Sequence, residues 1–291
     1  MKELTLVIPV FNEARSLDRL LPEVEAFCRR QGCRAIWVND GSTDGSAALL
    51  DRHARPPVME VVHLKLNRGY GGAIKAGIRR VRTPLLVTLD GDGQHDLGDV
   101  LRLYERKVAA DADMVVGRRS GLGDHWYRRL GKRLLRGVAR LLMPVTVEDL
   151  NSGMKLYDTA LAKKYIRLCP DSMAFSDVIT LVFLNQRRRV EEVDIQVRPR
   201  TTGVSTINTM TAIDTLAEII NIVVLFNPSR IFLPLALLFV AAGFAWGLPM
   251  LWRGAGVSAG VVLLWVSGLL FFLLGLLAQQ LSLIRRDRVE D

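Results

Sequence analysis

Three oxygen-bearing side chains directly follow an apolar, strand-like run. Leu85–Leu89 leads into Asp90, Asp92 and Gln94 in the stretch DGDGQHD. The two aspartates flank a glycine, so both carboxylates can face one hard cation, and Gln94 adds a neutral oxygen. A lone Asp-x-Asp motif often occurs by chance, but its position after an expected buried strand favours a metal-binding role. We therefore predict a Mg²⁺ or Mn²⁺ site whose metal neutralises charge on a leaving diphosphate.

Other polar clusters also follow apolar runs. In VNDGSTDGS, Asp40 can accept hydrogen bonds from a base or ribose, small residues such as Ser42 let the backbone approach a ligand, and Asp44 is expected to cap a helix. Glu13 ends the first run and could serve the same nucleotide. Lys75 in NRGYGGAIKAG suits a phosphate near a helix N-terminus. That stretch matches neither the P-loop nor the dinucleotide fingerprint, which argues against an ATPase or a dehydrogenase.

Strand-like and helix-like patterns alternate along the first part of the chain. Such alternation indicates a mostly parallel sheet with helices on both faces. Ligands gather at the carboxyl ends of its strands, so the polar clusters are expected to share one edge. We expect strands at Leu4–Val10, Ala35–Val38, Met59–Leu64, Leu85–Leu89 and Met114–Val116, and helices capped by Ser16, starting near Ser46, and over Gly72–Val81 and Leu97–Ala109.

The pattern is less regular afterwards. We expect helices at Trp126–Leu142 and near Phe175–Asn185, and a strand at Val190–Val197. The segment Ile207–Phe226 has one apolar helical face, which would either lie at a membrane interface or pack on the preceding domain.

Two long apolar runs at the C-terminal end carry no charged residue. Ile231–Trp252 and Gly254–Ile284 are each long enough to cross a hydrocarbon core of about 30 Å as a helix. Arg230 precedes the first and Arg285 follows the second, so the positive-inside rule predicts that both termini are cytoplasmic. The N-terminus lacks the features of a signal peptide. We expect a multi-pass protein of the cytoplasmic (inner) membrane, with its N-terminal domain in the cytoplasm.

Composition narrows the classes of partner. The net charge is +9, and arginine, which suits phosphates and anionic membrane surfaces, outnumbers lysine. A solvated basic surface explains much of this excess. No nucleic-acid-binding module is recognisable, so no nucleic-acid partner is expected. The three cysteines lack metal-ligand spacing and are expected to be reduced thiols. The oligomeric state stays open, with a homo-oligomer as one alternative.

Taken in order, these motifs resemble those of a known enzyme family. LVIPVFNEA, VNDGSTDGS, NRGYGGAIKAG, TLDGDGQHD, GRR, NSGMKLYD and RPRTTGVSTI look like a family 2 glycosyltransferase with the GT-A fold, and more narrowly like the polyprenyl-phosphate glycosyltransferases of the dolichol-phosphate mannose synthase group. The resemblance covers about Leu4–Ile207. Together with the apolar segments described above, it leads us to expect a GT-A catalytic domain over 1–206, an interfacial helix region over 207–229, two transmembrane helices over 230–285 and a tail over 286–291.

The resemblance implies inverting transfer of a sugar from a UDP- or GDP-linked donor to an undecaprenyl or dolichyl phosphate. The resemblance implies nucleotide binding by Pro9, Glu13 and Asp40. It places Asp90, Asp92 and Gln94 at the metal and diphosphate, and Ser42 and Lys75 are further candidates for donor binding from the chemistry of their motifs. Residues implied at the acceptor phosphate or the donor diphosphate are Arg118, Arg119, Ser152, Arg200 and Ser205. Because GRRS offers two adjacent arginines, which of them faces the site stays open.

A phosphate acceptor changes what catalysis requires. A sugar hydroxyl must lose a proton as it attacks, whereas a phosphate monoester, with a second pKa near ~6, is already largely a dianion at pH 7. The task becomes that of holding two anions together, which arginines and a divalent cation can do. Asp149 and Asp177 are candidates for an auxiliary base, for orienting an arginine, or for ordinary capping and ion pairing.

Two other functions compete with this interpretation. One is a transferase that uses a sugar hydroxyl, such as a processive polysaccharide synthase. That class carries a Gln-x-x-Arg-Trp motif, and none of the five tryptophans here follows an arginine. The other is a membrane-tethered nucleotide-binding protein without catalysis, which the presence of both Asp90 and Asp92 disfavours.

Overall fold

The chain forms two compact units in the computed structural model. The first comprises Met1–Asp124 with Val145–Thr206, and the second His125–Pro144 with Ile207–Asp291. The helix expected at 126–142 lies outside the described residues, as does the segment 207–226 apart from residues 223 and 224. The structure describes residues 1–119, 147–198, 223–224, 227–254 and 256–290.

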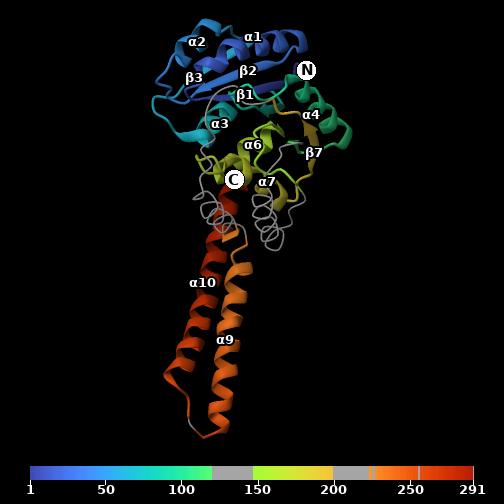
Figure 1. The fold of residues 1–291 in the computed structure, drawn as a ribbon. Coiled ribbons are helices and arrows are strands. Elements are labelled where there is room, and N and C mark those ends of the chain that lie inside the picture. The colour runs from blue at the N-terminus through green and yellow to red at the C-terminus, as the bar shows by residue number, and fades with distance from the viewer. Residues whose placement is uncertain (120–146, 199–222, 225–226, 255, 291) are drawn as a thin grey trace. The chain divides into compact units, whose positions relative to one another are not determined.

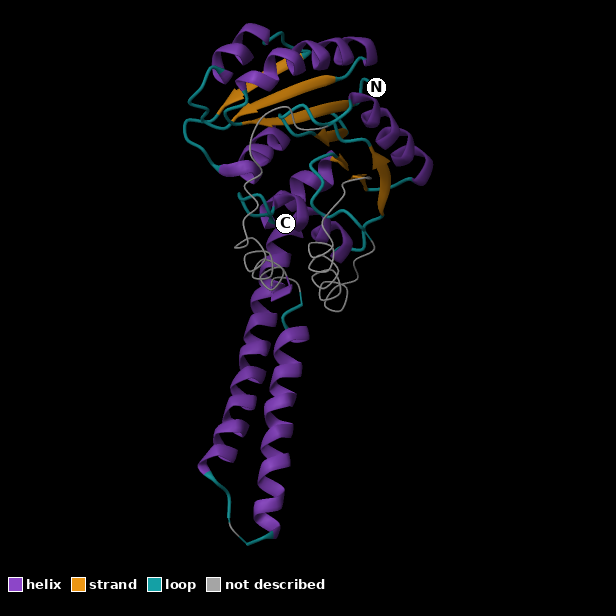
Figure 2. Cartoon of the chain, viewed as in Figure 1, coloured by secondary structure: helices purple, strands orange, loops and turns teal. Residues whose placement is uncertain are grey.

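A seven-stranded sheet forms the centre of the first unit (Figure 2). Its strands are β1 (Leu4–Val10), β2 (Arg34–Asn39), β3 (Met59–His63), β4 (Leu85–Thr88), β5 (Met114–Arg119), β6 (Lys155–Asp158) and β7 (Val190–Ile195). Their order is β3-β2-β1-β4-β6-β5-β7. All neighbours run parallel except β6, which is antiparallel to both β4 and β5. The mostly parallel sheet predicted from the alternating pattern is confirmed.

Helices cover both faces of this sheet (Figure 1). The apolar positions of the first helix are buried, because its period of 3.6 residues turns one stripe toward the sheet. The hydrophobic core between this helix and the sheet also contains side chains of the second and fourth helices. The first face carries α1 (Ala14–Gln31), α2 (Ser46–His53) and α4 (Leu97–Ala110), and the other carries α3 (Gly69–Arg80), α6 (Thr159–Tyr165), the 3₁₀ turn η1 (Ile166–Leu168) and α7 (Phe175–Asn185).

The start of α1 differs from the expected one. The helix begins at Ala14, so Ser16 lies in its first turn and is not its cap. The carboxylate of Asp44 caps instead, since its two oxygens accept the main-chain N–H groups of Ala14 and Ser46 at 3.1 and 2.9 Å. Asp44, expected to cap a helix, thus accepts the first N–H group of both α1 and α2, while the N-cap positions themselves are Glu13 and Gly45.

The described part of the second unit is a pair of long helices, α9 (Ser229–Trp252) and α10 (Ala259–Glu290). Both are long and apolar enough to cross a membrane. They pack closely because a glycine on one helix makes room for a large side chain of the other. A Cβ at Gly243, for example, would lie 2.5 Å from the ring of Trp265. Such small-residue contacts are typical of helix pairs in membranes.

Candidate active site

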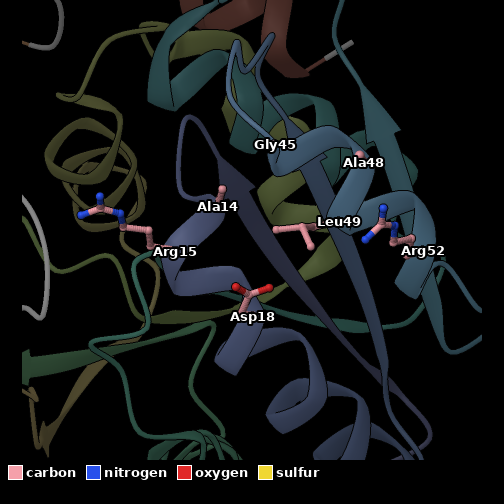
Figure 3. A pocket seen from close by; sticks show the side chains of 7 residues that line it. All are labelled: Ala14, Arg15, Asp18, Gly45, Ala48, Leu49 and Arg52. Atoms are coloured by element: carbon pink, nitrogen blue, oxygen red, sulfur yellow. The ribbon is translucent and has the colours of Figure 1, made fainter.

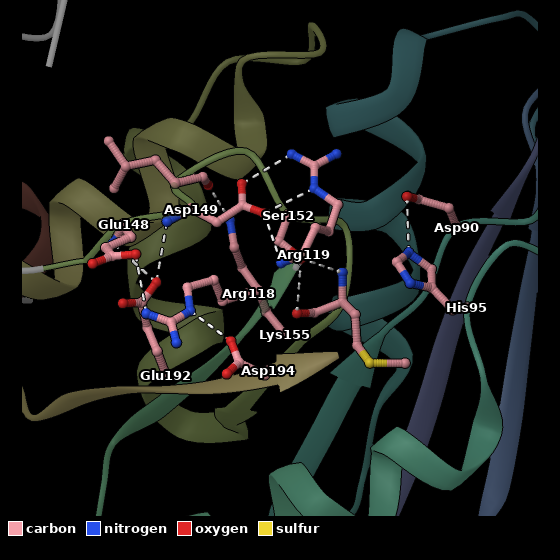
Figure 4. A network of polar contacts seen from close by, with 12 residues as sticks. Asp90, His95, Arg118, Arg119, Glu148, Asp149, Ser152, Lys155, Glu192 and Asp194 are labelled. Atoms are coloured by element: carbon pink, nitrogen blue, oxygen red, sulfur yellow. Dashed lines mark hydrogen bonds and ion pairs between the residues drawn. The ribbon is translucent and has the colours of Figure 1, made fainter. Parts of the chain in front are cut away.

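Asp90 stands at the end of β4 and receives contacts from three parts of the chain. Its Oδ1 accepts a hydrogen bond from the Tyr70 hydroxyl at 2.9 Å. Its Oδ2 lies 3.1 Å from Nε2 of His95 (Figure 4). The carboxylate also packs on Gly153, where an added Cβ would fall 2.2 Å from Oδ2. The side chain is therefore held in one orientation.

The contact between Asp90 and His95 favours the charged form of both. Burial opposes the charge of Asp90, but hydrogen bonds from His95 and Tyr70 and the charges of His95 and Arg119 outweigh it and lower the pKa of Asp90. Burial also opposes protonation of His95, yet Asp90 and Asp92 raise the pKa of that imidazole. The contact thus lowers the pKa of the carboxyl group and raises that of the imidazole.

Asp92 and Gln94 lie on the turn that follows Asp90. Oδ1 of Asp92 accepts the main-chain N–H of Gln94 at 3.0 Å, which fixes this turn. The turn needs Gly93 at φ 73, a left-handed conformation that costs glycine little. At the preceding glycine the backbone passes against the carbonyl of Pro9, so Pro9 supports the loop by packing.

These oxygens suit a hard divalent cation without completing its coordination. The described residues contain no group of three or more His, Cys, Asp or Glu side chains that could hold a metal. The carboxylates of Asp90 and Asp92 and the amide oxygen of Gln94 are of the oxygen type that such a cation prefers. Mg²⁺ keeps several positions for water and phosphate oxygens. The residues therefore fit a cation that binds together with a diphosphate.

The two adjacent arginines at the end of β5 point in different directions, because successive side chains of a strand alternate. Nε and Nη2 of Arg119 donate to the two carboxylate oxygens of Asp149 at 2.8 and 2.9 Å, and its main-chain N–H donates to the same carboxylate at 3.1 Å. Arg118 instead pairs with Asp194 and Glu148 at 2.6 and 3.0 Å. The geometry thus brings Arg119, and not Arg118, toward Asp90.

The surroundings of Arg119 and Asp149 favour the charged form of both side chains. The hydrogen bonds that Arg119 donates to Asp149 and the charges of Asp149, Asp90 and Asp177 outweigh burial and raise the pKa of Arg119. Burial opposes the charge of Asp149, but the Arg119 guanidinium lowers the pKa of that carboxyl. A carboxylate held in this way is a weak base, so its geometry suits orientation of the arginine.

Two further predicted residues lie beside this pair. Ser152 is fully buried, with its hydroxyl 3.3 Å from the main-chain nitrogen of Met154. Asp177 is in the first turn of α7 and interacts electrostatically with Arg119 and with the buried ammonium of Lys155. The structure therefore brings together Asp90, Arg119, Asp149, Ser152 and Asp177.

The predicted nucleotide residues lie at the ends of β1 and β2. Asp40 is 2% exposed, and its Oδ1 accepts the main-chain N–H of Arg68 at 2.8 Å. Ser42 accepts the N–H of Asn12 at 3.1 Å, while Glu13 accepts the hydroxyl of Ser16 at 2.5 Å. These contacts join the first two polar loops at one edge of the sheet.

Lys75 is placed differently from the phosphate-binding position expected for it. Its Nζ donates to the carbonyl of Cys169 and to Oδ1 of Asp171, the latter at 2.6 Å. The glycines that begin α3 pack on the same loop, since a Cβ at Gly71 would fall 2.5 Å from the carbonyl of Pro170. This geometry favours a structural role for the glycine-rich motif, and nucleotide binding by Lys75 stays a prediction.

A surface cavity of about 370 Å³ lies between α1 and α2 (Figure 3). None of its lining residues belongs to the predicted site. It is lined by Ala14, Arg15, Asp18, Gly45, Ala48, Leu49 and Arg52.

Sequence reasoning missed several residues that shape the site. His95 belongs to the motif DGDGQHD, but its spacing from Asp90 does not predict the contact between the two side chains. The same holds for Arg198, whose main-chain N–H donates to the carbonyl of Gln94 at 2.9 Å and whose guanidinium lies 3.0 Å from Asp96. The local sequence pattern predicts neither the contact of His95 with Asp90 nor that of Arg198 with the distant metal loop. Arg200 and Ser205 lie outside the described residues.

Two family models match the chain. Residues 5–166 match the model described as glycosyl transferase family 2, and residues 227–284 match the model of the GtrB C-terminal hairpin. Together with the two apolar helices, the second match identifies a membrane-anchored protein.

Two curated relatives of this chain carry the same name. The undecaprenyl-phosphate 4-deoxy-4-formamido-L-arabinose transferase of Edwardsiella ictaluri is 32% identical over 74% of this chain, and the match covers 66% of that protein. The protein of the same name from Sodalis glossinidius is 27% identical over 98% of this chain and 90% of its own length.

Solved structures show the same fold. The glucosyl-3-phosphoglycerate synthase of Mycobacterium tuberculosis, in complex with phosphoglyceric acid, has a TM-score of 0.58 at 15% identity and covers 78% of this chain and 79% of its own. The same enzyme with Mn²⁺ and UDP-glucose has a TM-score of 0.57 at 16% identity over 78% and 79% of the two chains. At these identities the likeness concerns the GT-A fold alone, which confirms the predicted fold class.

Proposed function

This chain belongs to glycosyl transferase family 2, and on that premise we propose that it transfers a sugar from a nucleotide sugar to a polyprenyl phosphate, forming a polyprenyl-monophosphate sugar with inversion at the anomeric carbon. The proposal agrees with the names of the relatives, which are undecaprenyl-phosphate transferases. Undecaprenyl phosphate is accordingly the first acceptor to test.

One observation carries the proposal. Arg119 is oriented by a two-point contact with Asp149, and its charge acts on Asp90. A fixed guanidinium next to the carboxylates of the metal loop provides a place for an anionic acceptor beside the donor diphosphate. Guanidinium groups match phosphate geometry through paired N–H groups, which makes Arg119 a suitable ligand for the lipid phosphate.

The proposed reaction needs no general base. A phosphate oxygen of the acceptor attacks the anomeric carbon, the bond between that carbon and the donor diphosphate breaks, and the nucleoside diphosphate leaves. The acceptor is largely a dianion at pH 7, so no proton has to be removed. Asp149 then orients Arg119, and Asp177 adds negative charge that holds the cations of the site.

A divalent cation would be held by Asp90, Asp92 and Gln94. Mg²⁺ or Mn²⁺ bound there supplies positive charge to the departing diphosphate. The residues at the ends of the first two strands, Asp40, Glu13 and Ser42 among them, would bind the nucleoside part. Assays with a panel of nucleotide sugars will identify the base and the sugar that these residues select.

The membrane hairpin suggests how the lipid reaches the site. We place the catalytic domain and both termini in the cytoplasm, since Arg230 lies in the first turn of α9 and three arginines lie near the end of α10. The prenyl chain can then stay in the bilayer while its phosphate enters the site. The proposed domains keep the predicted bounds, with the catalytic part over 1–206.

Transfer of labelled sugar into organic-extractable lipid tests this function. Membranes containing the protein, undecaprenyl phosphate and Mn²⁺ are given UDP- and GDP-linked sugars in turn. The Asp92→Asn variant should lose activity, while Asp111→Asn, at the left-handed residue that ends α4, serves as a matched control. A lipid product from one donor supports the proposal. Metal-dependent nucleotide binding without any lipid product would favour a sugar-hydroxyl acceptor or a binding role.

A further inference from the structure

Lys155 is a buried lysine in the middle of the sheet. It begins β6 and pairs with Thr88 of β4 and Val116 of β5. The whole residue is 0% exposed. Lysine is almost never fully buried unless its ammonium is paired, so its partners indicate why the chain keeps it there.

The ammonium joins two segments that are distant in sequence. Nζ donates to the carbonyl of Leu150 at 2.7 Å and to the carbonyl of Ser176. Leu150 lies between Asp149 and Ser152, and Ser176 precedes Asp177 in the first turn of α7. Each contact is thus one or two residues away from a side chain of the candidate site, and Figure 4 shows Lys155 beside Asp149 and Ser152.

The surroundings of the ammonium are charged on several sides. Burial lowers the pKa of Lys155 to about 8, while the charges of Asp177 and Asp149 oppose this shift and that of Arg119 adds to it. The charge of Asp90 also raises the pKa of the ammonium. Burial raises the pKa of the Cys169 thiol, and the charge of Lys155 partly offsets that rise. Lys155 therefore shares its electrostatic environment with the site without contacting the metal loop.

We propose that Lys155 is a positioning residue for the acceptor half of the reaction. Its ammonium ties the loop that bears Asp149 and Ser152 to the first turn of α7, so that Arg119 is held at one place relative to Asp177. This inference rests on the proposed transfer to a phosphate acceptor.

The test compares Lys155→Met with Lys163→Met in the full-length, membrane-embedded protein. Methionine keeps the volume and removes the ammonium. Lys163 is the matched control, since its Nζ also donates to a main-chain carbonyl, that of Val81, at 2.6 Å, but lies on α6 outside the site. For each variant, kcat, KM for undecaprenyl phosphate, donor affinity and the thermal unfolding midpoint are measured.

For Lys155→Met we expect kcat/KM for the acceptor to fall about 10- to 100-fold, with donor affinity and unfolding midpoint close to those of the unmodified protein. Lys163→Met should keep full activity. Acceptor kinetics unchanged in Lys155→Met would overturn the inference. So would a parallel loss of donor affinity, acceptor kinetics and thermal stability, which would indicate a purely structural lysine.

A pH profile adds a second readout. Because its pKa is lowered to about 8, Lys155 loses its charge as pH rises through that value, and the unmodified enzyme should lose acceptor kcat/KM above it. The Lys155→Met variant should lack this decline, and the same decline in the variant would contradict the inference. If the unmodified protein makes no lipid product, the proposed function fails; if it does and Lys155→Met matches it, only the role of Lys155 fails.

Discussion

Arg119 meets Asp149 through two parallel hydrogen bonds of 2.8 and 2.9 Å, while its own main-chain N–H donates to the same carboxylate. A guanidinium fixed at two points has little freedom to turn, and its position relative to Asp90 is therefore set before any ligand binds. Pre-organisation of this kind lowers the cost of bringing an anionic acceptor to an anionic donor.

Arg119→Lys should reduce kcat/KM for the lipid phosphate about 100-fold, because an ammonium cannot reproduce the paired contacts and leaves the acceptor misplaced. Arg118→Lys is the matched control. Its guanidinium pairs with Asp194 and Glu148 outside the site, so its kinetics should stay within a few-fold of the unmodified enzyme. Steady-state assays with varied acceptor measure both, and a greater loss in Arg118→Lys would reverse the assignment.

Asp149→Asn should weaken the fold at neutral pH but not at acid pH. The pKa of Asp149 is lowered below its usual 3.8, so its ion pair stabilises the protein above that pH and is lost as pH falls through the lowered value. Thermal unfolding of both proteins between about pH 3 and pH 7 should show curves that converge on acidification. A constant gap across that range would mean that the carboxylate charge does not stabilise the fold.

Tyr70→Phe removes one hydrogen bond from Asp90 and leaves the ring in place. Since a hydrogen bond to a charged group contributes about 1.5–3 kcal/mol, the variant should be measurably less stable and should bind Mn²⁺ with nucleotide more weakly. Calorimetric titration of the metal in the presence of UDP checks this. Tyr104→Phe on α4, away from the site, is the control, and equal effects of the two changes would refute a specific role for Tyr70.

Arg198→Ala should loosen the metal loop, because its guanidinium links Asp96 to Glu23, at 3.0 and 3.5 Å. The expected result is a higher metal concentration for half-maximal activity, with a smaller change at saturating metal. Arg189→Ala, which removes an exposed ion pair with Glu191, provides the comparison. An unchanged metal requirement in Arg198→Ala would show that the backbone contacts alone fix the loop.

Elements that depend on residues close together in the sequence could be predicted from hydrophobic patterns. The strand at Leu4–Val10 and the helix face of Leu17 and Phe27 follow from hydrophobic period, and both are confirmed. The fold class and the membrane hairpin could also be predicted, since alternation and long apolar runs require no knowledge of distant contacts.

Contacts between distant segments could not be predicted in this way. The short strand Lys155–Asp158 was not recognised, because a buried lysine at its start interrupts any apolar pattern. The choice between Arg118 and Arg119 depends on the register of a strand end against a loop 30 residues away. Lys75 was expected at a phosphate, whereas its partner Asp171 lies 96 residues further along.

The most direct measurement follows two labels in one reaction, with the donor labelled in its sugar and, separately, in the phosphate attached to that sugar. The proposed chemistry breaks the bond between the anomeric carbon and the diphosphate, so sugar label should enter a lipid that carries one phosphate, while phosphate label should remain in the nucleoside diphosphate. Both labels entering the lipid would show sugar-phosphate transfer and contradict the account. Sugar label in a product that lacks the prenyl chain would contradict it as well.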